Sequence, residues 1–369
     1  MDTAGAQDLR WLDLAFALAR RGLGRVWPNP AVGCVIVQNG RPVGRGWTQP
    51  GGRPHAEAMA LATAGPAARG ATAYVTLEPC AHHGRTPPCA TALAEAGIAR
   101  LVSTIQDPDP RVSGRGFAAL RASGVEVDIG HRVPETRAQS AGFLSRIEQA
   151  RPHLTLKLAT TLDGRIATSR GESRWISGPE ARRMAHLLRV RHDAILVGAG
   201  TARSDDPQLD VRELGLGAAS PVRVLADGQL TLPAEAKLVK TARQQPLWVL
   251  HLAKADPARA EELAAAGATL IACPAGPDGR IDPAGMLAAI GARGITRVLC
   301  EGGGQLAASL IAARLVDRLI CVTAGRVIGA DGVPGIGAFG LAHLADAPGF
   351  SLVAQRRIGE DLMAEWVAR

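Results

Sequence analysis

Short apolar runs alternate with helical segments along the first 130 residues. Clusters of Gly, Pro or Asn separate the runs, whose length is typical of buried strands. Asn39-Gly40 between two extended segments predicts a tight β-hairpin. The expected strands are residues 32–37, 41–47, 73–77, 99–104 and 125–129, and the expected helices are residues 8–23, 55–64, 91–96 and 117–123.

The same alternation resumes after residue 150. A polar helix at 134–149 followed by Arg151-Pro152 predicts a joint between two α/β domains, residues 1–150 and 151–369, each long enough to bury its own core. The helices expected in the second half are residues 179–190, 257–265, 283–292 and 305–313. The strands expected there are residues 153–159, 194–197, 222–226, 247–250, 269–272, 298–300, 315–323, 350–354 and 362–368.

Charge and composition narrow the class of partner. Hydrophobic residues make up 47% of the chain and charged residues 21%, which indicates a compact globular protein. The formal charge of +8 suggests nucleic acid as a possible partner. However, each half of the chain carries +4, and the sequence has no basic arm or run. Phosphorylated small molecules therefore fit better than nucleic acid, and a general surface bias towards arginine is the alternative.

The cysteines and the hydropathy pattern bear on the compartment. Six cysteines are few for 369 residues, and several lie in apolar strands, so we expect a reduced, cytoplasmic protein. Asp8 and Asp13 interrupt the pattern of a secretion signal. A run of about 18 apolar residues is absent from the sequence, so we expect no membrane span.

One histidine, two cysteines and one glutamate have the spacing of a catalytic zinc site. His55, Cys80 and Cys89 offer three ligands, which leaves a fourth position open. Glu57 can face the same pocket as His55 only if both stand at the start of a helix, because a two-residue step turns about 200°. His-x-Glu followed by Pro-Cys is the signature of zinc deaminases, in which the glutamate moves the proton from water to the leaving amine.

The loop between the two cysteines keeps alternatives open. Eight residues separate them, whereas nucleoside and nucleic-acid deaminases have two. His82, His83 and Arg85 in this loop are candidates to contact a pyrimidine carbonyl or a phosphate. His82 or His83 can also close a purely structural zinc site, and an ordinary surface loop is a third interpretation.

Two glycine-rich segments and one lysine stand out in the second half. Residues 198–207 follow an apolar run, and residues 301–306 stand between a strand and a helix, where backbone N–H groups can hold a pyrophosphate. Each is a weak signal alone, because many connections in α/β domains are rich in glycine. Lys157 is the first lysine of the chain and is otherwise read as a surface residue, and Ser177 is read as a helix cap.

The sequence closely resembles the bifunctional deaminase/reductase family of riboflavin biosynthesis. In the first half the resemblance rests on residues 28–33 (Pro-Asn-Pro-Ala-Val-Gly), 55–57, 79–89 and 107–110 (Asp-Pro-Asp-Pro). It implies a cytidine-deaminase-like three-layer α/β/α domain that binds Zn²⁺ and removes the ring amine of a pyrimidinone ribosylamine 5′-phosphate. Asn29, otherwise a turn residue, and His82 are then substrate contacts, and Glu57 is catalytic.

For the second half the resemblance implies a dihydrofolate-reductase-like α/β domain that uses NADPH to reduce the ribosyl chain to a ribityl chain. Lys157 and Asp205 are candidates to assist proton movement, and Arg189 with Arg212 is expected to clamp a phosphate. Gly228 and residues 325–329 depart from the family pattern. The implied cofactor positions are Ala159, Trp175, Thr201, Asp205, Gly303, Gly304, Gln305 and Leu306. The implied substrate positions are Lys157, Ser173, Arg189, Leu209, Arg212 and Glu301.

Two other functions remain compatible with the residues. One is a zinc deaminase of nucleosides or nucleic acid whose second half only binds. The other keeps the deaminase and makes the second half an assembly domain. We also expect a homo-oligomer, of a size that the sequence does not indicate.

Overall fold

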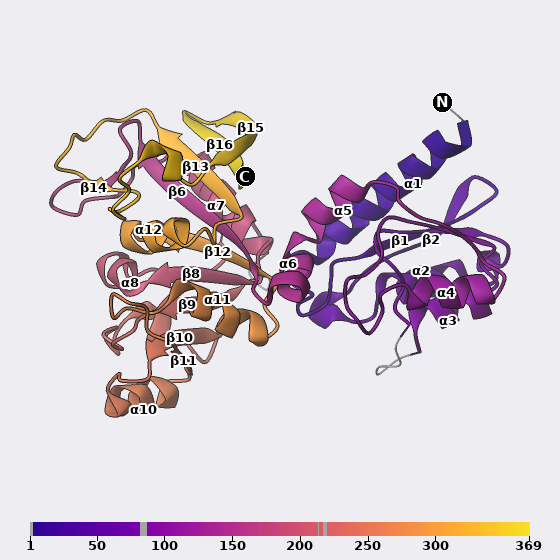
Figure 1. Cartoon of the computed structure of the whole chain (residues 1–369), viewed down its shortest axis with the longest axis horizontal. Helices are drawn as coiled ribbons and strands as arrows, with labels where there is room; N and C mark the ends of the chain where they lie inside the picture. The colour runs from indigo at the N-terminus through magenta and orange to yellow at the C-terminus, as the bar shows by residue number, and fades with distance from the viewer. Residues whose placement is uncertain (1–2, 82–86, 213, 217–219) are drawn as a thin grey trace. The chain divides into compact units, whose positions relative to one another are not determined.

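The computed structural model describes residues 3–81, 87–212, 214–216 and 220–369. The backbone forms two compact units, residues 1–150 and 151–369 (Figure 1). Each unit is described by itself. Among the described residues, no helix has both the length and the apolar content needed to span a bilayer.

Unit 1 is built on a five-stranded sheet with the order β2-β1-β3-β4-β5. Its strands are β1 (Gly33–Gln38), β2 (Arg41–Trp47), β3 (Thr72–Val75), β4 (Arg100–Ser103) and β5 (Glu126–Asp128). β1 pairs antiparallel with β2 and β3, and the β3-β4-β5 part is parallel. Asn39 and Gly40 have φ angles of 50° and 70°, which confirms the predicted hairpin turn between β1 and β2.

Helices cover both faces of this sheet, so the unit has the expected three α/β/α layers. Side chains that alternate along β1 separate the two cores: Val35 and Val37 pack with α1 (Thr3–Ala19), and Cys34 and Ile36 face the helices of the other layer. That layer holds α2 (Ala56–Ala64), α3 (Cys89–Glu95) and α4 (Arg115–Ala122), as Figure 1 shows. Two further helices, α5 (Val133–Gln139) and α6 (Ala141–Gln149), end the unit.

The close packing of α2 on β2 places the start of α2. A Cβ atom at Gly46 would lie 2.1 Å from the carbonyl oxygen of Ala56, so only glycine lets the two backbones approach this closely. Ala56 is the first residue of α2 and follows His55 directly. The sheet therefore holds the start of α2, with His55 and Glu57, against β2.

Unit 2 is built on a nine-stranded sheet with the order β11-β10-β9-β8-β12-β6-β13-β16-β15. The strands from β11 to β13 are parallel, and β16 and β15 pair antiparallel at one edge. The strands are β6 (His153–Thr161), β8 (Ala194–Gly198), β9 (Val222–Ala226), β10 (Leu247–Leu252), β11 (Thr269–Cys273), β12 (Arg297–Gly302), β13 (Arg318–Ala324), β15 (Phe350–Ile358) and β16 (Asp361–Ala368). A small separate ladder joins β7 (Arg165–Ala167) and β14 (Val333–Pro334).

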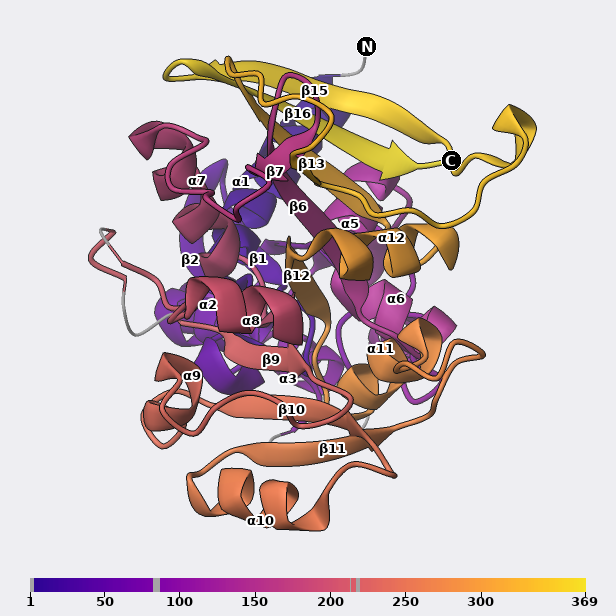
Figure 2. The ribbon, with the colours of Figure 1, turned by 90° about the vertical axis from the view of Figure 1, so that its left-hand side faces the viewer.

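Helices lie on both sides of the central strands of unit 2. Figure 2 shows α7 and α8 on one side and α11 and α12 on the other. The helices are α7 (Pro179–Val190), α8 (Ala199–Asp205), α9 (Lys237–Lys240), α10 (Pro257–Ala265), α11 (Pro283–Ala292) and α12 (Gly304–Ala312). The loops after β6, β8 and β12 all leave the carboxyl ends of neighbouring parallel strands, which is the usual place for a ligand in an α/β sheet.

Three local expectations differ from the structure. The single helix expected at 134–149 is two helices, because Ser140 leaves the helical region with ψ at 7°. Ser177 does not cap α7: Gly178 takes the N-cap position, and no side chain caps it. The segment after β8, for which the sequence analysis assigned no helix, forms α8.

Candidate functional site

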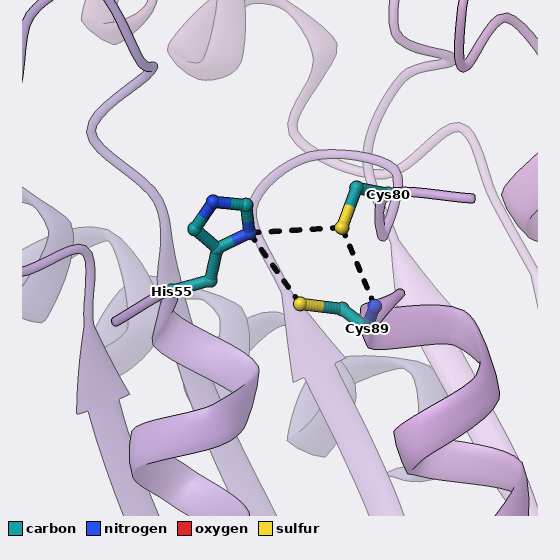
Figure 3. Close-up of side chains that lie close together, drawn as sticks. All are labelled: His55, Cys80 and Cys89. Carbon is teal, nitrogen blue, oxygen red and sulfur yellow. Dashed lines mark hydrogen bonds between the residues drawn. The ribbon is translucent and has the colours of Figure 1, made fainter. Parts of the chain in front are cut away.

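His55, Cys80 and Cys89 come together at the edge of the unit 1 sheet (Figure 3). His55 occupies the N-cap position of α2, Cys80 lies after β3, and Cys89 begins α3. The Nδ1 atom of His55 is 3.6 Å from the Sγ atom of Cys80 and 3.5 Å from that of Cys89. The Cys89 backbone N–H donates to Cys80 Sγ over 3.3 Å.

The spacing of these three atoms fits one zinc ion. Zinc–nitrogen bonds of about 2.05 Å and zinc–sulfur bonds of about 2.3 Å at a tetrahedral angle put nitrogen and sulfur ~3.6 Å apart. Both measured nitrogen–sulfur distances lie within about 0.1 Å of this value. The donor set is one imidazole and two thiols, which zinc prefers, and it leaves one position for a reactant.

Glu57 lies in the first turn of α2 and faces the same cavity as His55. Its side chain is buried, with 4% of its surface exposed. Burial, together with the nearby Cys80 thiolate, raises the pKa of Glu57 to about 7. A carboxyl group with a pKa near neutrality can both accept and return a proton, as the sequence interpretation requires.

The cavity around these residues has a volume of ≈ 260 Å³. Asn29 lies in its wall, donates from Nδ2 to the carbonyl oxygen of Gly52 over 2.8 Å, and stands 3.5 Å from His55 Nε2. It is therefore both a loop residue and a cavity residue. The lining is Pro28, Asn29, Pro30, Val32, Thr48, Arg53, His55, Glu57, Leu77, Glu78, Cys80, Asp107, Asp109, Arg111, Val112, Phe143 and Arg146.

The loop predicted to contact the substrate falls outside the described residues. This applies to His82, His83 and Arg85. Their assigned contacts, and the structural-zinc alternative that depends on a fourth histidine ligand, stay predictions.

Glu78 organises the segment that carries Cys80, and the sequence analysis did not assign it a role. Its buried carboxylate accepts four backbone N–H groups, from Asp107 (3.0 Å), Gly114 (2.9 Å), Gly116 (2.8 Å) and Phe117 (3.3 Å). Three of these donors belong to the N-terminal end of α4, where a negative charge is favoured. A Cβ at Gly116 would stand 2.0 Å from the carbonyl oxygen of Pro79, so α4 also packs directly on the residue before Cys80.

Replacing Glu78 by glutamine is expected to weaken zinc binding about 10–100-fold, the range typical of groups that orient metal ligands. The amide NH₂ would meet N–H donors instead of accepting from them, which also lowers the free energy of unfolding by about 1–3 kcal/mol. Competition with a coloured chelator measures the first effect and denaturant unfolding the second. Glu95→Gln, an exposed change on α3, is the control and should leave both unchanged. Wild-type zinc affinity in the Glu78 variant would contradict this role.

A second and larger cavity, of ≈ 750 Å³, lies in unit 2 at the carboxyl ends of the parallel strands. Ten of the fourteen cofactor and substrate residues predicted for this half line it: Lys157, Ala159, Ser173, Trp175, Arg189, Thr201, Asp205, Leu209, Arg212 and Glu301. Gly303, Gly304, Gln305 and Leu306 are not part of the lining. Gly303 adjoins it, because a Cβ there would lie 3.1 Å from Oγ1 of Thr201.

Arg189 and Glu301 form a buried ion pair in the wall of this cavity. Arg189 Nε and Nη2 donate to the Glu301 carboxylate over 2.6 and 2.8 Å, and Nη1 donates to the carbonyl oxygen of Asp210 over 2.8 Å. Burial raises the pKa of Glu301, but Arg189 outweighs it and holds the pKa below its usual value. Glu301 therefore occupies the bidentate edge of Arg189 in this structure, and the phosphate clamp of Arg189 with Arg212 stays a prediction.

Lys157 lies on β6 and lines the same cavity. It is therefore not the solvent-exposed surface lysine that the sequence analysis gave as the alternative. Burial lowers its pKa, and the nearby Glu301 opposes that shift. Trp175 is 63% exposed, and the guanidinium of Arg182 stacks on its ring with the carbon 4.4 Å from the ring centre. Asp205 ends α8, and its carbonyl oxygen accepts from Arg174 over 2.8 Å.

Several cavity residues of unit 2 were missed by the sequence analysis. Two of them are Arg182 and His186, which stand with the predicted Arg189 at positions i, i+4 and i+7 of α7, and all three line the cavity. That spacing was visible in the sequence and marks one helix face. Arg174 and Lys237 also line the cavity, but Arg174 lies in a turn and Lys237 begins the short helix α9, so they follow no such pattern.

Comparison with known protein families agrees with these two sites. A model of the cytidine and deoxycytidylate deaminase zinc-binding region matches residues 6–105. A model of the RibD C-terminal domain matches residues 152–364. The fold and the matches define a zinc-dependent deaminase joined in one chain to an α/β reductase. More particularly, the chain belongs to the RibD family of bifunctional riboflavin biosynthesis deaminase/reductases.

Full-length relatives support this assignment. The riboflavin biosynthesis protein RibD of Escherichia coli is 40% identical over 96% of this chain and 98% of its own length. The RibD protein of Aquifex aeolicus is 38% identical over 96% and 97%. The structure of Acinetobacter baumannii RibD superposes with a TM-score of 0.88 at 34% identity, covering 99% of both chains.

A fourth relative carries both activities in its name. It is the diaminohydroxyphosphoribosylaminopyrimidine deaminase/5-amino-6-(5-phosphoribosylamino)uracil reductase of Thermotoga maritima. Its structure superposes with a TM-score of 0.87 at 32% identity and covers 99% of both chains.

Proposed function

We propose that this chain catalyses two consecutive steps of riboflavin biosynthesis. The first is hydrolytic deamination of 2,5-diamino-6-(5-phosphoribosylamino)pyrimidin-4-one in unit 1. The second is NADPH-dependent reduction of the ribosyl chain of 5-amino-6-(5-phosphoribosylamino)uracil in unit 2. The observation that carries the proposal is the zinc-fitting triad with Glu57 beside it in unit 1, in one chain with a segment that matches the RibD C-terminal domain.

In the deaminase site the protein's own residues hold the reactants and move the proton. Zn²⁺, when bound by His55, Cys80 and Cys89, acts as a Lewis acid that lowers the pKa of water to near neutrality. Glu57 accepts the proton of the attacking water and delivers it to the departing amine. The water oxygen bonds to the ring carbon, the carbon–nitrogen bond breaks, and the amine leaves as ammonia. Asn29 keeps the His55 ring in place and presents its amide to the pyrimidine.

In the reductase site NADPH, when bound, would supply the hydride that reduces the anomeric carbon of the opened ribosylamine. Ala159, Trp175, Thr201 and Asp205 would border the cofactor, with residues 303–306 beside them. Ser173, Leu209 and Arg212 would contact the substrate. Lys157, which lines this cavity and whose pKa is lowered by burial, would deliver the proton that balances hydride addition.

Location and assembly belong to the same proposal. Disulfide bonds join none of the six cysteines, all of which lie in the described part of the chain, and this fits the reducing cytoplasm. A homo-oligomer is proposed without a defined size. A nucleic-acid deaminase with a passive second half is not favoured, because the second half matches the RibD C-terminal domain along nearly its whole length.

Metal analysis combined with mass-resolved product identification tests both activities. We expect about one zinc per chain and, without NADPH, conversion of the diaminopyrimidinone to the uracil, a gain of one mass unit. With NADPH, the reduced ribityl product should follow, two mass units heavier, with equimolar NADPH oxidation. A zinc-containing protein that deaminates but never oxidises NADPH in the presence of the uracil would remove the second half of the proposal.

A further inference from the structure

The wall of the deaminase cavity extends beyond the segment that this chain shares with deaminases in general. The match to the zinc-binding region ends at residue 105. That shared region holds His55, Glu57, Cys80 and Cys89, which determine the reaction. The lining residues beyond it are Asp107, Asp109, Arg111, Val112, Phe143 and Arg146. Residues that determine the specificity for this substrate are therefore expected among these six.

The helix α6 contributes two of them from one face. Phe143 and Arg146 are three residues apart, so their side chains lie on the same side of the helix, and both line the cavity. Phe143 is buried in the core of unit 1, with 7% of its surface exposed, and it is the one aromatic residue of the lining. Arg146 is half-buried, and α6 therefore brings an aromatic ring and a guanidinium group to a single site.

The lining of the cavity carries both carboxylates and guanidinium groups. Glu78 is satisfied by four backbone N–H groups. Asp109 is held by Arg111, whose Nε donates to both carboxylate oxygens over 2.9 and 3.1 Å. Arg53 and Arg146 are the other guanidinium groups of the lining.

The chemistry of the reaction fixes how the substrate is oriented in the cavity. The ring amine must reach Glu57 and the zinc ligands, so the 5′-phosphate at the other end of the molecule must lie away from them. A guanidinium group binds a phosphate through two parallel hydrogen bonds. A flat aromatic ring such as Phe143 provides the apolar surface on which a pyrimidine packs.

We propose that α6 forms the substrate-specific wall of the deaminase site, with Phe143 against the pyrimidine and Arg146 holding the 5′-phosphate. This inference rests on the proposed function, because it assumes a phosphorylated pyrimidine as the substrate. It assigns the discrimination of phosphorylated from unphosphorylated pyrimidines to a helix outside the shared deaminase region.

The test compares Arg146→Gln with the unsubstituted full-length protein on two substrates, the phosphorylated pyrimidine and the same compound without its phosphate. For the phosphorylated substrate we expect kcat/KM to fall about 10–100-fold, mainly through KM, as for loss of a charge-assisted hydrogen bond. For the unphosphorylated compound the two proteins should agree within about twofold. Arg137→Gln, an exposed arginine on α5 outside the lining, is the matched control and should change neither.

NADPH oxidation by the same chain reports whether each variant is folded. If the unsubstituted protein deaminates neither compound, the proposed function itself fails, whatever Arg146 does. If it deaminates and Arg146→Gln loses activity equally on both compounds, or on neither, the inference is overturned. Should Arg146→Gln lose the NADPH reaction as well, Arg146→Lys replaces it. That variant keeps the charge without the bidentate geometry, and a smaller loss confined to the phosphorylated substrate is then expected; equal behaviour on both compounds would overturn the inference.

Discussion

Glu57→Gln is expected to lower the deaminase kcat by about 10²–10⁴-fold while the NADPH-dependent reaction of the same chain is unchanged. Glutamine has nearly the same size and keeps a hydrogen-bonding group at the mouth of α2, but it cannot accept a proton from water. Glu57 is not one of the three residues whose ligand atoms fit zinc, so the metal content should stay near one ion per chain. Mass-resolved product formation and metal analysis on the same sample measure both.

Two control variants show whether the effect is specific to the proton carrier. Glu95→Gln makes the same chemical change at an exposed position on α3 and should behave as the unsubstituted protein. Cys89→Ser should lose zinc and deamination together, which distinguishes loss of the metal from loss of the proton carrier. Full deaminase activity in Glu57→Gln would remove Glu57 from its role, and loss of zinc in that variant would make it a ligand instead.

The zinc site was predictable because its chemistry is local in the sequence. His55 and Glu57 stand two residues apart, and that spacing allows one cavity only at the start of a helix, where the structure places them. Cys80 and Cys89 bracket a short loop and carry their own signature. Most strands and helices of both units were also predicted, because alternation of apolar runs and helical stretches sets them directly.

The roles that were missed depend on contacts between distant segments. Glu78 binds backbone N–H groups up to 39 residues away, and nothing about a glutamate before Pro-Cys distinguishes that from a solvent-exposed side chain. Arg146 reaches the cavity because α6 packs back on the sheet, which no local pattern indicates. The family resemblance placed Arg189 and Glu301 in the right cavity, but it did not reveal that they bind each other.

That ion pair leads to the second large effect. Glu301→Gln is expected to lower the free energy of unfolding by about 3–5 kcal/mol, because it leaves the buried guanidinium of Arg189 without its counter-charge. Arg189 and Glu301 are only 12% and 10% exposed, so water from the cavity can replace the lost partner only in part. Glu262→Gln breaks the exposed pair of Glu262 with Arg259 in the same unit and should cost less than about 1 kcal/mol. Denaturant unfolding of the full-length proteins measures both.

A double variant separates the structural role of the pair from its role in the reaction. Arg189→Met combined with Glu301→Gln removes both charges, so it should recover much of the stability that Glu301→Gln loses. The reductase rate should nevertheless stay low, because Lys157 then loses the carboxylate that counters the effect of burial on its pKa. The double variant also removes Arg189, which lowers the pKa of Lys157, but the effect of Glu301 is the larger, so that pKa should fall. Lys157 donates only when it is protonated, so the reductase rate should decline with rising pH at a lower pH than in the unsubstituted protein. A double variant that regains stability and full NADPH oxidation would show that the pair only holds α7 against β12.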